Sequence, residues 1–494
     1  MQKLRKNIQK ELSKLGQEFK TTRISDLCDM SDFKDKVIQH DILTFDYSKQ
    51  RLDQKTLDFL LQIPDLVNLK ESFNLLFSGK VNNQSEDRAV THTIYRNKNE
   101  EDKFELIFSE REKIKSFLDK NTSNHCFKNL ICISIGGSRA GPELLNEFLS
   151  KDDQLNIYFC SSYDLEEIKE ALRKCQQSET VVFASSKSFE TSEILKNLEY
   201  VKSWLSDKPE INLEDHLYGI SANESAMAAL GIKKENQFLL LDSLGGRYSI
   251  WSSISLPAFV NANYESYLDF LYGAYQADVY TDTTPWEHNI SVLMALLSIW
   301  NRNSLDISSH GIFTYNFKLR SLTKYIAQLS MESNGKSINF DADVSPFLTT
   351  QLIWGGYGVE NQHSTFQWLM QGKTDTSCDF IGTNNVETHT KDSYEMLLSQ
   401  VLAMTKGKND KEHPFKTIKG NNPCSIFQLE NLDLRSLGFL LALYEHKVFV
   451  EALILGIDPF DQWGVELGKE FSLNAKRDKE FFKPYFSSSV LPKS

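Results

Sequence analysis

Short apolar runs alternate with amphipathic segments between residues 130 and 242, and this alternation constrains the fold more than any other feature of the chain. Short apolar runs bounded by turn residues are typical of buried strands, and longer segments with helical spacing are typical of helices. We expect strands at Leu130–Ile135, Leu155–Ser162, Thr180–Ser186, Leu217–Ser221 and Phe238–Asp242, with helices at Pro142–Leu149, Leu165–Cys175, Thr191–Leu205 and Glu224–Leu230. This order predicts a parallel sheet with helices on both faces, where ligands bind beyond the carboxyl ends of the strands.

The remainder of the chain is predicted to hold a second, larger α/β unit and a helical segment at the start. Apolar periodicity indicates helices at Phe270–Val279, Ile290–Trp300, Leu319–Leu329 and Leu437–Ile457, and a short strand at Gln351–Trp354. The first part is mostly helical in pattern, as in the run Thr56–Phe77. We therefore expect residues 1–125 to pack as a mainly helical segment on the large domain, 126–262 to form a smaller α/β domain, and 263–494 to form a larger one with C-terminal helices.

Three basic residues, Arg88, His92 and Arg96, stand at intervals of four. On a helix they would share one face. A solvated basic surface is the plain interpretation of such a face, and the spacing alone does not decide whether it has a further role.

The net charge and the cysteine content argue against some partners and against a disulfide-forming compartment. A formal net charge of −12 over 494 residues argues against nucleic acid or an anionic membrane as the main partner, so an anionic substrate needs a local positive pocket. The seven cysteines are odd in number and none has C-x-x-C spacing, which favours reduced thiols in a cytoplasmic protein. The charged N-terminus lacks the apolar core of a secretory signal, and Leu437–Ile457 contains charged residues typical of a buried helix, not of a membrane span.

Two polar loops, Gly136–Pro142 and Ser185–Thr191, follow the first and third predicted strands, and each precedes a helix. Free N–H groups at a helix start bind anions, most often phosphate. Simple helix capping by Ser and Thr would explain either loop alone. Neither loop has the spacing of a nucleotide-binding motif, so a small phosphorylated metabolite is predicted, and not ATP or NAD. The candidate ligands of its phosphate in the second loop are the hydroxyls of Ser186, Ser188 and Thr191 and the backbone of Lys187.

Glu332 and Arg247 are the candidate groups for proton transfer. Glu332 stands in the segment Gln328–Lys336, where a periodic apolar stretch gives way to the turn signal Ser-Asn-Gly. A carboxylate held there can remove a proton from carbon, or it is a solvated residue of a helix end. Arg247 follows two glycines after a strand, and its permanent charge suits a developing oxyanion unless its role is structural.

His363 and Lys469 are weaker candidates. His363 follows a Gly-rich loop and is expected to open a helix over Ser364–Met370, where it would act on an oxygen near neutral pH or serve as a structural residue. Lys469, taken alone, reads as a solvated helix residue.

Seven segments together resemble the glucose-6-phosphate isomerase (phosphoglucose isomerase) family, in the family's order, between Phe77 and Lys469. They are "FSGKVNNQSEDRAVTHTIYR", "ISIGGSRAGP", "SSKSFETSE", "GGRYSIWSS", "QLSMESNGKS", "WGGYGVENQH" and "YEHKVFVEALILGIDPFDQWGVELGK". The resemblance implies two sugar-isomerase-type, doubly wound parallel-sheet α/β sandwiches with helical N-terminal and C-terminal additions. It also implies an active site between the sandwiches, a homodimer, and a role in glycolysis and gluconeogenesis.

The resemblance further implies a role for each candidate in interconverting glucose 6-phosphate and fructose 6-phosphate through a cis-enediol(ate). Glu332 would move the proton between C1 and C2, with Arg247 stabilising the intermediate and Gln328 lining the sugar site. His363, donated across the dimer interface, would assist ring opening with Lys469 as its partner. The second loop, with Ser186, Lys187, Ser188 and Thr191, would grip the phosphate, and Gly137 and Ser138 of the first loop would form the other wall. No metal or redox cofactor is expected.

The chain departs from the family pattern at Ser134, Ser188, Glu190, Val359, Glu360 and Asn361, which affects the expected sugar contacts and leaves the catalytic groups in place. A non-catalytic sugar-phosphate-binding regulator of the same fold is the main alternative, and it would be free to lose Glu332, Arg247, His363 or Lys469. An amidotransferase-type isomerase would need an N-terminal cysteine nucleophile, and the chain starts Met-Gln-Lys. A further interaction role is neither favoured nor excluded.

Overall fold

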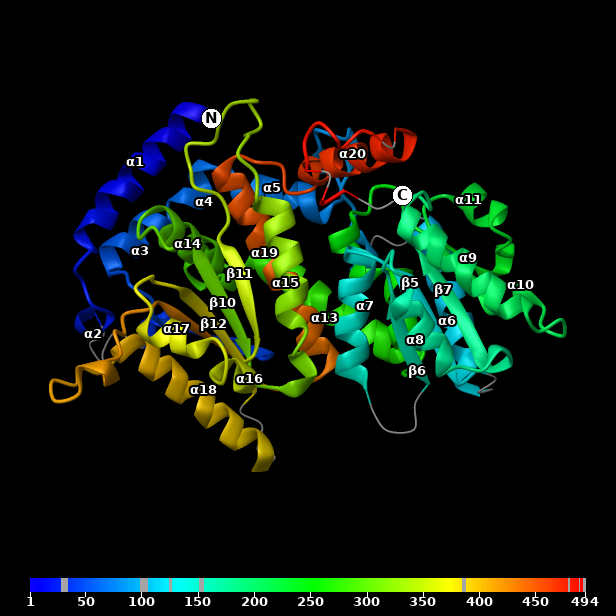
Figure 1. Ribbon diagram of the computed structural model, residues 1–494. Helices are drawn as coiled ribbons and strands as arrows, with labels where there is room; N and C mark the ends of the chain where they lie inside the picture. The colour runs from blue at the N-terminus through cyan, green and yellow to red at the C-terminus, as the bar shows by residue number, and fades with distance from the viewer. Residues whose placement is uncertain are drawn as a thin grey trace.

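The computed structural model describes residues 1–27, 34–97, 105–123, 127–150, 155–383, 388–478, 480–487 and 489–491. It contains two sheets side by side, with helices between them and around them (Figure 1). The α/β class with parallel sheets is therefore confirmed, whereas the three domain boundaries stay a prediction.

The first sheet holds the five strands expected from the alternation. In spatial order they are β6 (Asn156–Cys160), β5 (Asn129–Ser134), β7 (Thr180–Ser185), β8 (Leu217–Ser221) and β9 (Gln237–Leu239), all parallel. Both faces are covered, because Leu130 and Cys132 join one apolar core whereas Ile131 and Ile133 join another. The connecting helices are α7 (Gly137–Leu149), α8 (Glu166–Arg173), α9 (Ser192–Ser206), α10 (Leu213–His216) and α11 (Glu224–Ala229).

The second sheet has a parallel centre and an antiparallel edge. Its order is β1 (Val37–Gln39), β2 (Leu43–Lys49), β13 (Cys424–Leu429), β12 (Ser377–Thr383), β10 (Ser309–Thr314) and β11 (Leu352–Tyr357). The first two strands run antiparallel to their neighbours, and the last four are parallel. The N-terminal segment is thus not only helical: it also adds two strands to the edge of the larger sheet.

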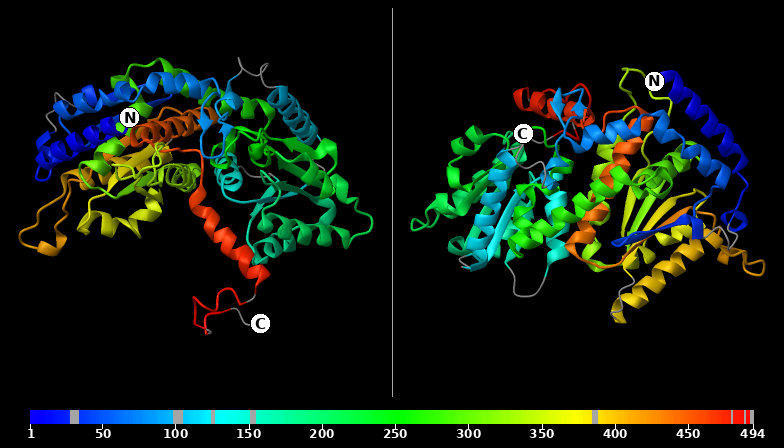
Figure 2. Two further views of the ribbon diagram at one scale, coloured as in Figure 1. Left: turned by 90° about the horizontal axis from the view of Figure 1, so that it is seen from above. Right: turned by 180° about the vertical axis from the view of Figure 1, so that it is seen from behind.

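Buried helices fill the space between the sheets. They include α13 (Tyr264–Thr283), α15 (Leu322–Asn334) and α19 (Leu434–Leu455), whereas α14 (Ile290–Asn303) packs on α19 at the second sheet (Figures 1 and 2). Two glycines let α13 and α19 touch: a Cβ on Gly273 would lie 1.9 Å from the carbonyl oxygen of Arg435, and one on Gly438 would lie 2.1 Å from that of Phe270. In the described part of the chain no helix, α19 included, has the length and apolar character needed to cross a membrane.

The remaining elements correct two expectations. The run Thr56–Phe77 is three helices, α3 (Gln54–Leu60), α4 (Ile63–Leu66) and α5 (Leu69–Phe77), because Pro64 and the left-handed residue Asn68 (φ 55°) interrupt it. His363 does not open a helix; it follows the short helix α16 (Gly358–Gln362). The other helices are α1 (Gln2–Glu18), α2 (Ile24–Leu27), α6 (Glu105–Ser123), α12 (Leu256–Phe259), α17 (Phe366–Gln371), α18 (Thr388–Lys406) and α20 (Glu466–Arg477).

The expectation that the basic triplet shares one face of a helix is wrong. Arg88 lies in strand β4 (Arg88–Ala89), which pairs with β3 (Asn82–Asn83), and Arg96 ends the 3-10 helix η2 (Ile94–Arg96). The three residues therefore share no helix face, and His92 and Arg96 are buried.

Arg96 is the centre of a buried ion cluster that joins α13 to α19. Its guanidinium donates to both carboxylate oxygens of Asp278, at 2.6 and 2.7 Å, and to Glu445 at 2.5 Å. The side chains of Arg96 and Glu445 have no exposed surface. His446 contacts Asp278 at 2.7 Å, and the indole N–H of Trp251 donates to the second oxygen of Glu445 at 2.8 Å. One cluster thus fixes two helices and the segment that carries Trp251.

A second buried carboxyl group, Glu110 on α6, is held by hydrogen bonds without a cation. The backbone N–H of Ser253 donates to it at 3.2 Å and the Ser253 hydroxyl donates to the same oxygen. Burial raises the pKa of Glu110 from 4.5 to about 8, and the bonds from Ser253 oppose that shift. The folded protein therefore keeps a proton on Glu110 that the unfolded chain releases at lower pH.

We predict that Glu110→Gln flattens the dependence of stability on pH. Between pH 4.5 and 8 the folded wild type holds one more proton than the unfolded chain, so its free energy of unfolding falls as pH rises through this window. Glutamine keeps an oxygen for Ser253 and cannot ionise, which removes this loss of about 1.4 kcal/mol per pH unit. Urea unfolding at several pH values measures the slope. Glu112→Gln on the exposed side of α6 is the control, and equal slopes for Glu110→Gln and wild type would contradict the prediction.

Candidate active site

Glu332 lies in the last turn of α15, as the turn signal indicates. The helix ends at Asn334, and Gly335 is its C-cap. The neighbouring Ser333 and Asn334 are buried, whereas 27% of the Glu332 side chain is exposed. Gln328, one turn earlier, donates from Nε2 to Glu332 Oε2 at 3.0 Å. The carboxylate is thus oriented by its own helix and remains reachable from solvent.

Arg247 lies in the 3-10 helix η6 (Gly246–Trp251), and only 2% of its side chain is exposed. Its Nη1 is 3.6 Å from Glu332 Oε2, so the structure brings the candidate base and the candidate cation together. Four other bonds fix the guanidinium: Nε donates to Ser333 Oγ at 2.7 Å, Nη1 to Gln462 Oε1 at 3.0 Å, and Nη2 to the carbonyl oxygens of Asp461, at 3.0 Å, and Pro459. Arginine has five N–H donors. Within the described residues, the N–H group that makes none of these four bonds is the second one on Nη1, the nitrogen nearest Glu332.

The two polar loops lie next to each other at the carboxyl edge of the first sheet. Ser134 at the end of β5 pairs with Ser185 at the end of β7, so the loops that follow start at the same level. The strand order changes direction between β5 and β7, and such a switch point is where doubly wound sheets bind ligands.

Both loops lead into helix starts whose backbone N–H groups are not capped by a side chain. Gly136 caps α7 and Thr191 caps α9, and neither makes a side-chain capping bond. Simple capping therefore does not explain the Ser/Thr-rich loop. Gly137 and Ser138 form the first turn of α7, and the hydroxyls of Ser186 and Thr191 are 3.3 Å apart. This arrangement suits an anion.

The first loop is in direct contact with the segments that carry Arg247 and Glu332. A Cβ added to Gly137 would lie 2.2 Å from the backbone of Gly246, so only glycine permits this approach of α7 to η6. A Cβ on Gly136 would lie 3.5 Å from Nε2 of Gln328, the residue bonded to Glu332. The anion-binding edge and the carboxylate are thus neighbours.

The β3–β4 hairpin links the second loop to the other side of the site. Lys187 is 3.1 Å from Asp242 Oδ1, and Arg88 donates to the Asp242 carbonyl oxygen at 2.9 Å. Ser85 of the same hairpin donates to Asp461 Oδ2 at 2.5 Å. Burial lowers the pKa of Lys187, and the nearby charge of Arg88 lowers it further. Positive groups therefore gather here despite the negative net charge of the chain.

His363 and Lys469 are not assembled with the other groups by this single chain. His363 is exposed after α16, and within the described residues its ring makes no hydrogen bond or ion pair. Lys469 is on α20, 64% of its side chain is exposed, and its described partner is Glu466 at 2.7 Å. The pairing of His363 with Lys469 across a dimer interface stays a prediction.

Among the departures from the family pattern, Asn361 has a structural role that the chain itself explains. Its Nδ2 donates to the carbonyl oxygen of Tyr357 at 3.0 Å, and its Oδ1 accepts from the Thr365 hydroxyl at 2.9 Å. Ser134 is buried at the end of β5, 3.5 Å from the sulfur of Cys132.

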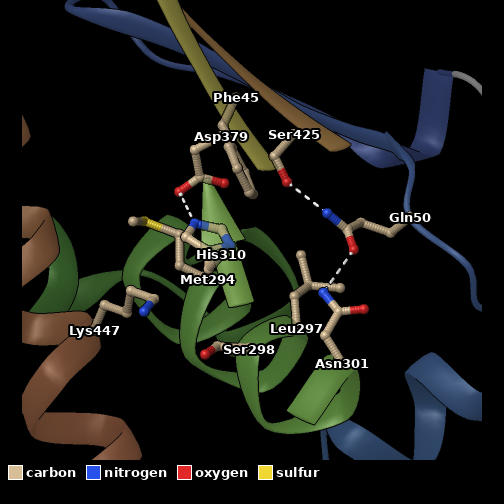
Figure 3. A pocket seen from close by; sticks show the side chains of 10 residues that line it. All are labelled: Phe45, Gln50, Met294, Leu297, Ser298, Asn301, His310, Asp379, Ser425 and Lys447. Carbon is tan, nitrogen blue, oxygen red and sulfur yellow. Dashed lines mark hydrogen bonds and ion pairs between the residues drawn. The ribbon is translucent and has the colours of Figure 1, made fainter. Parts of the chain in front are cut away.

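A second polar space in the protein is too small for a sugar phosphate. It has a volume of about 20 Å³, lies under the second sheet, and is lined by His310, Asp379, Lys447 and Asn301 among others (Figure 3). A space of this size holds about one water molecule. This small space is therefore not a candidate for the substrate site.

Gln462 and Ser333 are site residues that sequence reasoning missed. Both accept hydrogen bonds from Arg247, and Ser333 also contacts the Tyr248 hydroxyl at 2.9 Å. Ser333 follows Glu332 directly and begins the Ser-Asn-Gly turn signal, so its place beside the candidate base was a usable signal. Nothing in the local pattern around Gln462 indicates its contact with a residue 215 positions earlier.

Comparison with known proteins gives consistent matches over nearly the whole chain. The family model described as phosphoglucose isomerase matches residues 46–481. A glucose-6-phosphate isomerase of Pseudoalteromonas translucida is 34% identical and covers 93% of this chain and 91% of its own length. One of Acinetobacter baylyi is 33% identical, covering 94% and 91%. The crystal structure of a glucose-6-phosphate isomerase from Chlamydia trachomatis has a TM-score of 0.87 at 28% identity and covers 97% of this chain and 96% of that chain.

We predict that Gly137→Ala destabilises the protein by about 1–3 kcal/mol, because the new methyl group must displace the backbone of Gly246. Chemical unfolding measures the change. Gly464→Ala is the matched control, since a Cβ there meets open space and should change the free energy of unfolding by less than about 0.5 kcal/mol. Equal stability of the two variants would show that α7 and η6 are not in the contact described.

Proposed function

The chain belongs to the phosphoglucose isomerase family, and from this premise we propose that it interconverts glucose 6-phosphate and fructose 6-phosphate by ring opening and proton transfer through a cis-enediol(ate). The observation that carries the proposal is the 3.6 Å contact of Glu332 with Arg247 beside two uncapped helix starts. The alternative of a non-catalytic regulator finds no support, because Glu332, Arg247, His363 and Lys469 are all present.

Glu332 and Arg247 have complementary tasks in this reaction. The proton on C2 of an aldose is a poor acid, so its removal needs a base near the carbon and positive charge near the carbonyl oxygen. Glu332 is the base and carries the proton from C2 to C1. The remaining N–H of Arg247 Nη1 donates to the enediolate oxygen, and the four bonds that hold the guanidinium avoid reorganisation during the reaction. The same proton returns to the sugar, so the proposal needs no metal or redox cofactor.

The phosphate group holds the sugar in the reactive orientation. Its oxygens are proposed to bind Ser186, Ser188 and Thr191 and the start of α9, with Gly137 and Ser138 as the other wall. The Lys187 backbone belongs to the same loop. Because these groups are remote from C1 and C2, their binding energy can orient the reacting carbons against Glu332.

We propose that the active protein is a homodimer in which His363 reaches the site of the partner subunit, with Lys469 as its partner there. His363 is exposed next to β11, an edge strand of the second sheet, and Leu352 and Trp368 nearby are exposed apolar residues. The helix α20, which carries Lys469, has no buried residue and extends away from the body of the subunit (Figure 2). These surfaces are suited to a second copy of the chain.

The proposed setting is the cytoplasm, with the reaction serving both glycolysis and gluconeogenesis. The five cysteines of the described residues, Cys132, Cys160, Cys175, Cys378 and Cys424, are free thiols, and Cys28 and Cys126 lie outside those residues. Reduced thiols are usual in that compartment. No nucleic-acid or membrane partner is proposed.

Glu332→Gln should lower the rate of conversion of fructose 6-phosphate by at least about 10²-fold, because the amide cannot accept a proton. A coupled assay for glucose 6-phosphate, with chelator present, measures the rate. Glu395→Gln on α18 is the control for loss of one carboxylate. Near-normal turnover of Glu332→Gln would remove Glu332 from the role of base, and equal use of fructose without its phosphate would show that the two loops have been misassigned.

Mixing two inactive variants tests the donation of His363. In a mixed dimer of Glu332→Gln and His363→Ala chains, one site has both lesions and the other has neither, provided that His363 comes from the partner subunit. Activity should then return on subunit exchange to roughly a quarter of the wild-type rate, because half of the dimers are mixed and each has one intact site. If His363 acts within its own chain, every site keeps one lesion and no activity returns.

A further inference from the structure

Residues 458–463, here called the strap, provide most of the groups that orient Arg247. The strap follows α19, and two of its carbonyl oxygens, of Pro459 and Asp461, accept bonds from Arg247 Nη2. The side chain of Gln462 accepts from Nη1. Three of the four bonds that fix the guanidinium thus come from the strap. The residues of the strap that accept these bonds lie in neither a helix nor a strand. Any displacement of the strap must move the charge that faces Glu332.

One ion pair holds the strap against the end of the helix that carries the base. Lys336 Nζ is 2.9 Å from Asp461 Oδ1 and also donates to the carbonyl oxygen of Asp458. Only 18% of the Lys336 side chain and 10% of the Asp461 side chain are exposed. Lys336 stands four residues after Glu332, just beyond the C-cap of α15. The ion pair therefore connects the segment of the base to the segment that orients the cation.

We propose that Lys336 and Asp461 are positioning residues of the isomerase site, which set the orientation of Arg247 relative to Glu332 through the strap. The inference rests on the proposed function and adds two residues that do not touch the substrate. A positioning error of about 1 Å can cost 10²-fold in rate, so a pair with this effect is kinetically important although it lies outside the reacting groups.

The charges around the pair explain why Lys336 cannot simply be lost. Asp461 offers its carboxylate to Lys336 and to the Ser85 hydroxyl, and its carbonyl oxygen to Arg247. Burial lowers the pKa of Lys336, the carboxylate of Asp461 opposes that shift, and the charge of Arg247 adds to it. Without Lys336, a buried carboxylate would remain beside a guanidinium with one N–H group to offer. Asp461 would then compete for Arg247 with Glu332 and with the substrate oxygen.

A role in holding the C-terminal segment in place is the plain structural alternative. It predicts lower stability with unchanged catalysis in the molecules that remain folded. A positioning role predicts lower kcat with KM close to the wild-type value, because the strap contacts Arg247 and not the phosphate loops.

The test compares Lys336→Met, Asp461→Asn, the double variant and the control Lys324→Met, measuring kcat and KM for fructose 6-phosphate across pH. Lys324 is on α15 and pairs with Glu143, so its loss removes the same charge from the same helix. Asp461→Asn keeps an acceptor for Ser85 and the size of the side chain, which guards against a folding defect, and thermal unfolding checks each variant. We expect each single variant to lose about 10- to 10²-fold in kcat and the double variant to lose no more than the worse single one.

The outcomes separate the inference from the function on which it rests. A wild type that does not convert fructose 6-phosphate would overturn the proposed function. With an active wild type, kcat at the pH optimum within about twofold of wild type in either folded single variant would overturn the positioning role. Losses that simply multiply in the double variant would also overturn it, because they would show that the two residues act separately. A loss of kcat in Lys324→Met equal to that in Lys336→Met would assign the effect to net charge.

Discussion

The buried contact of Arg96 with Asp278 and Glu445 is the interaction on which the arrangement of the protein depends. It joins the two helices that touch through glycine, α13 and α19, at a place where the side chains of Arg96 and Glu445 have no exposed surface. Glu445 also accepts from Trp251, which ends the 3-10 helix that begins next to Arg247. The buried ion cluster thus holds one end of the 3-10 helix that contains Arg247 of the site. Removing one member would leave a buried charge without its counter-ion, which is more costly than never burying either.

The candidate site lies where the helix starts of the first sheet meet the end of α15. The first sheet contributes uncapped helix starts, and the second unit contributes the last turn of α15. Each parallel region has the same order, with its first strand between its second and third: β5 between β6 and β7, and β10 between β11 and β12. A sugar phosphate bound between them would place its anion on one unit and its reacting carbons on the other. The bonds of Arg247 show that the cationic part of this surface is rigid before any ligand arrives.

Local pattern predicted the parts of the fold that are governed by local forces. The strands β5, β7 and β8 and the turn after Glu332 follow from apolar runs and turn residues, and the structure places them within one or two residues of expectation. The basic triplet was misread because its spacing matched a helix while tertiary contacts with Asp278 and Glu445 decided the conformation. Gln462 and Lys336 were missed for a similar reason: their partners are distant in sequence, and a single chain carries no record of that proximity. Arg247, Glu332 and Gln328 lie together in this chain, whereas the roles of the residues named by resemblance, including the pairing of His363 with Lys469, stay predictions.

The edge of the second sheet has a consequence for how the protein is made. Strand β2 pairs with β13, and Thr44 bonds with Glu430, 386 positions later. A ribosome adds about 5–20 residues per second, so the early strand waits tens of seconds for its neighbour. The first sheet has no such delay, because all five of its strands lie within one continuous stretch of chain. The N-terminal strands thus present open edges until β13 has been made, whereas the strands of the first sheet meet their neighbours sooner.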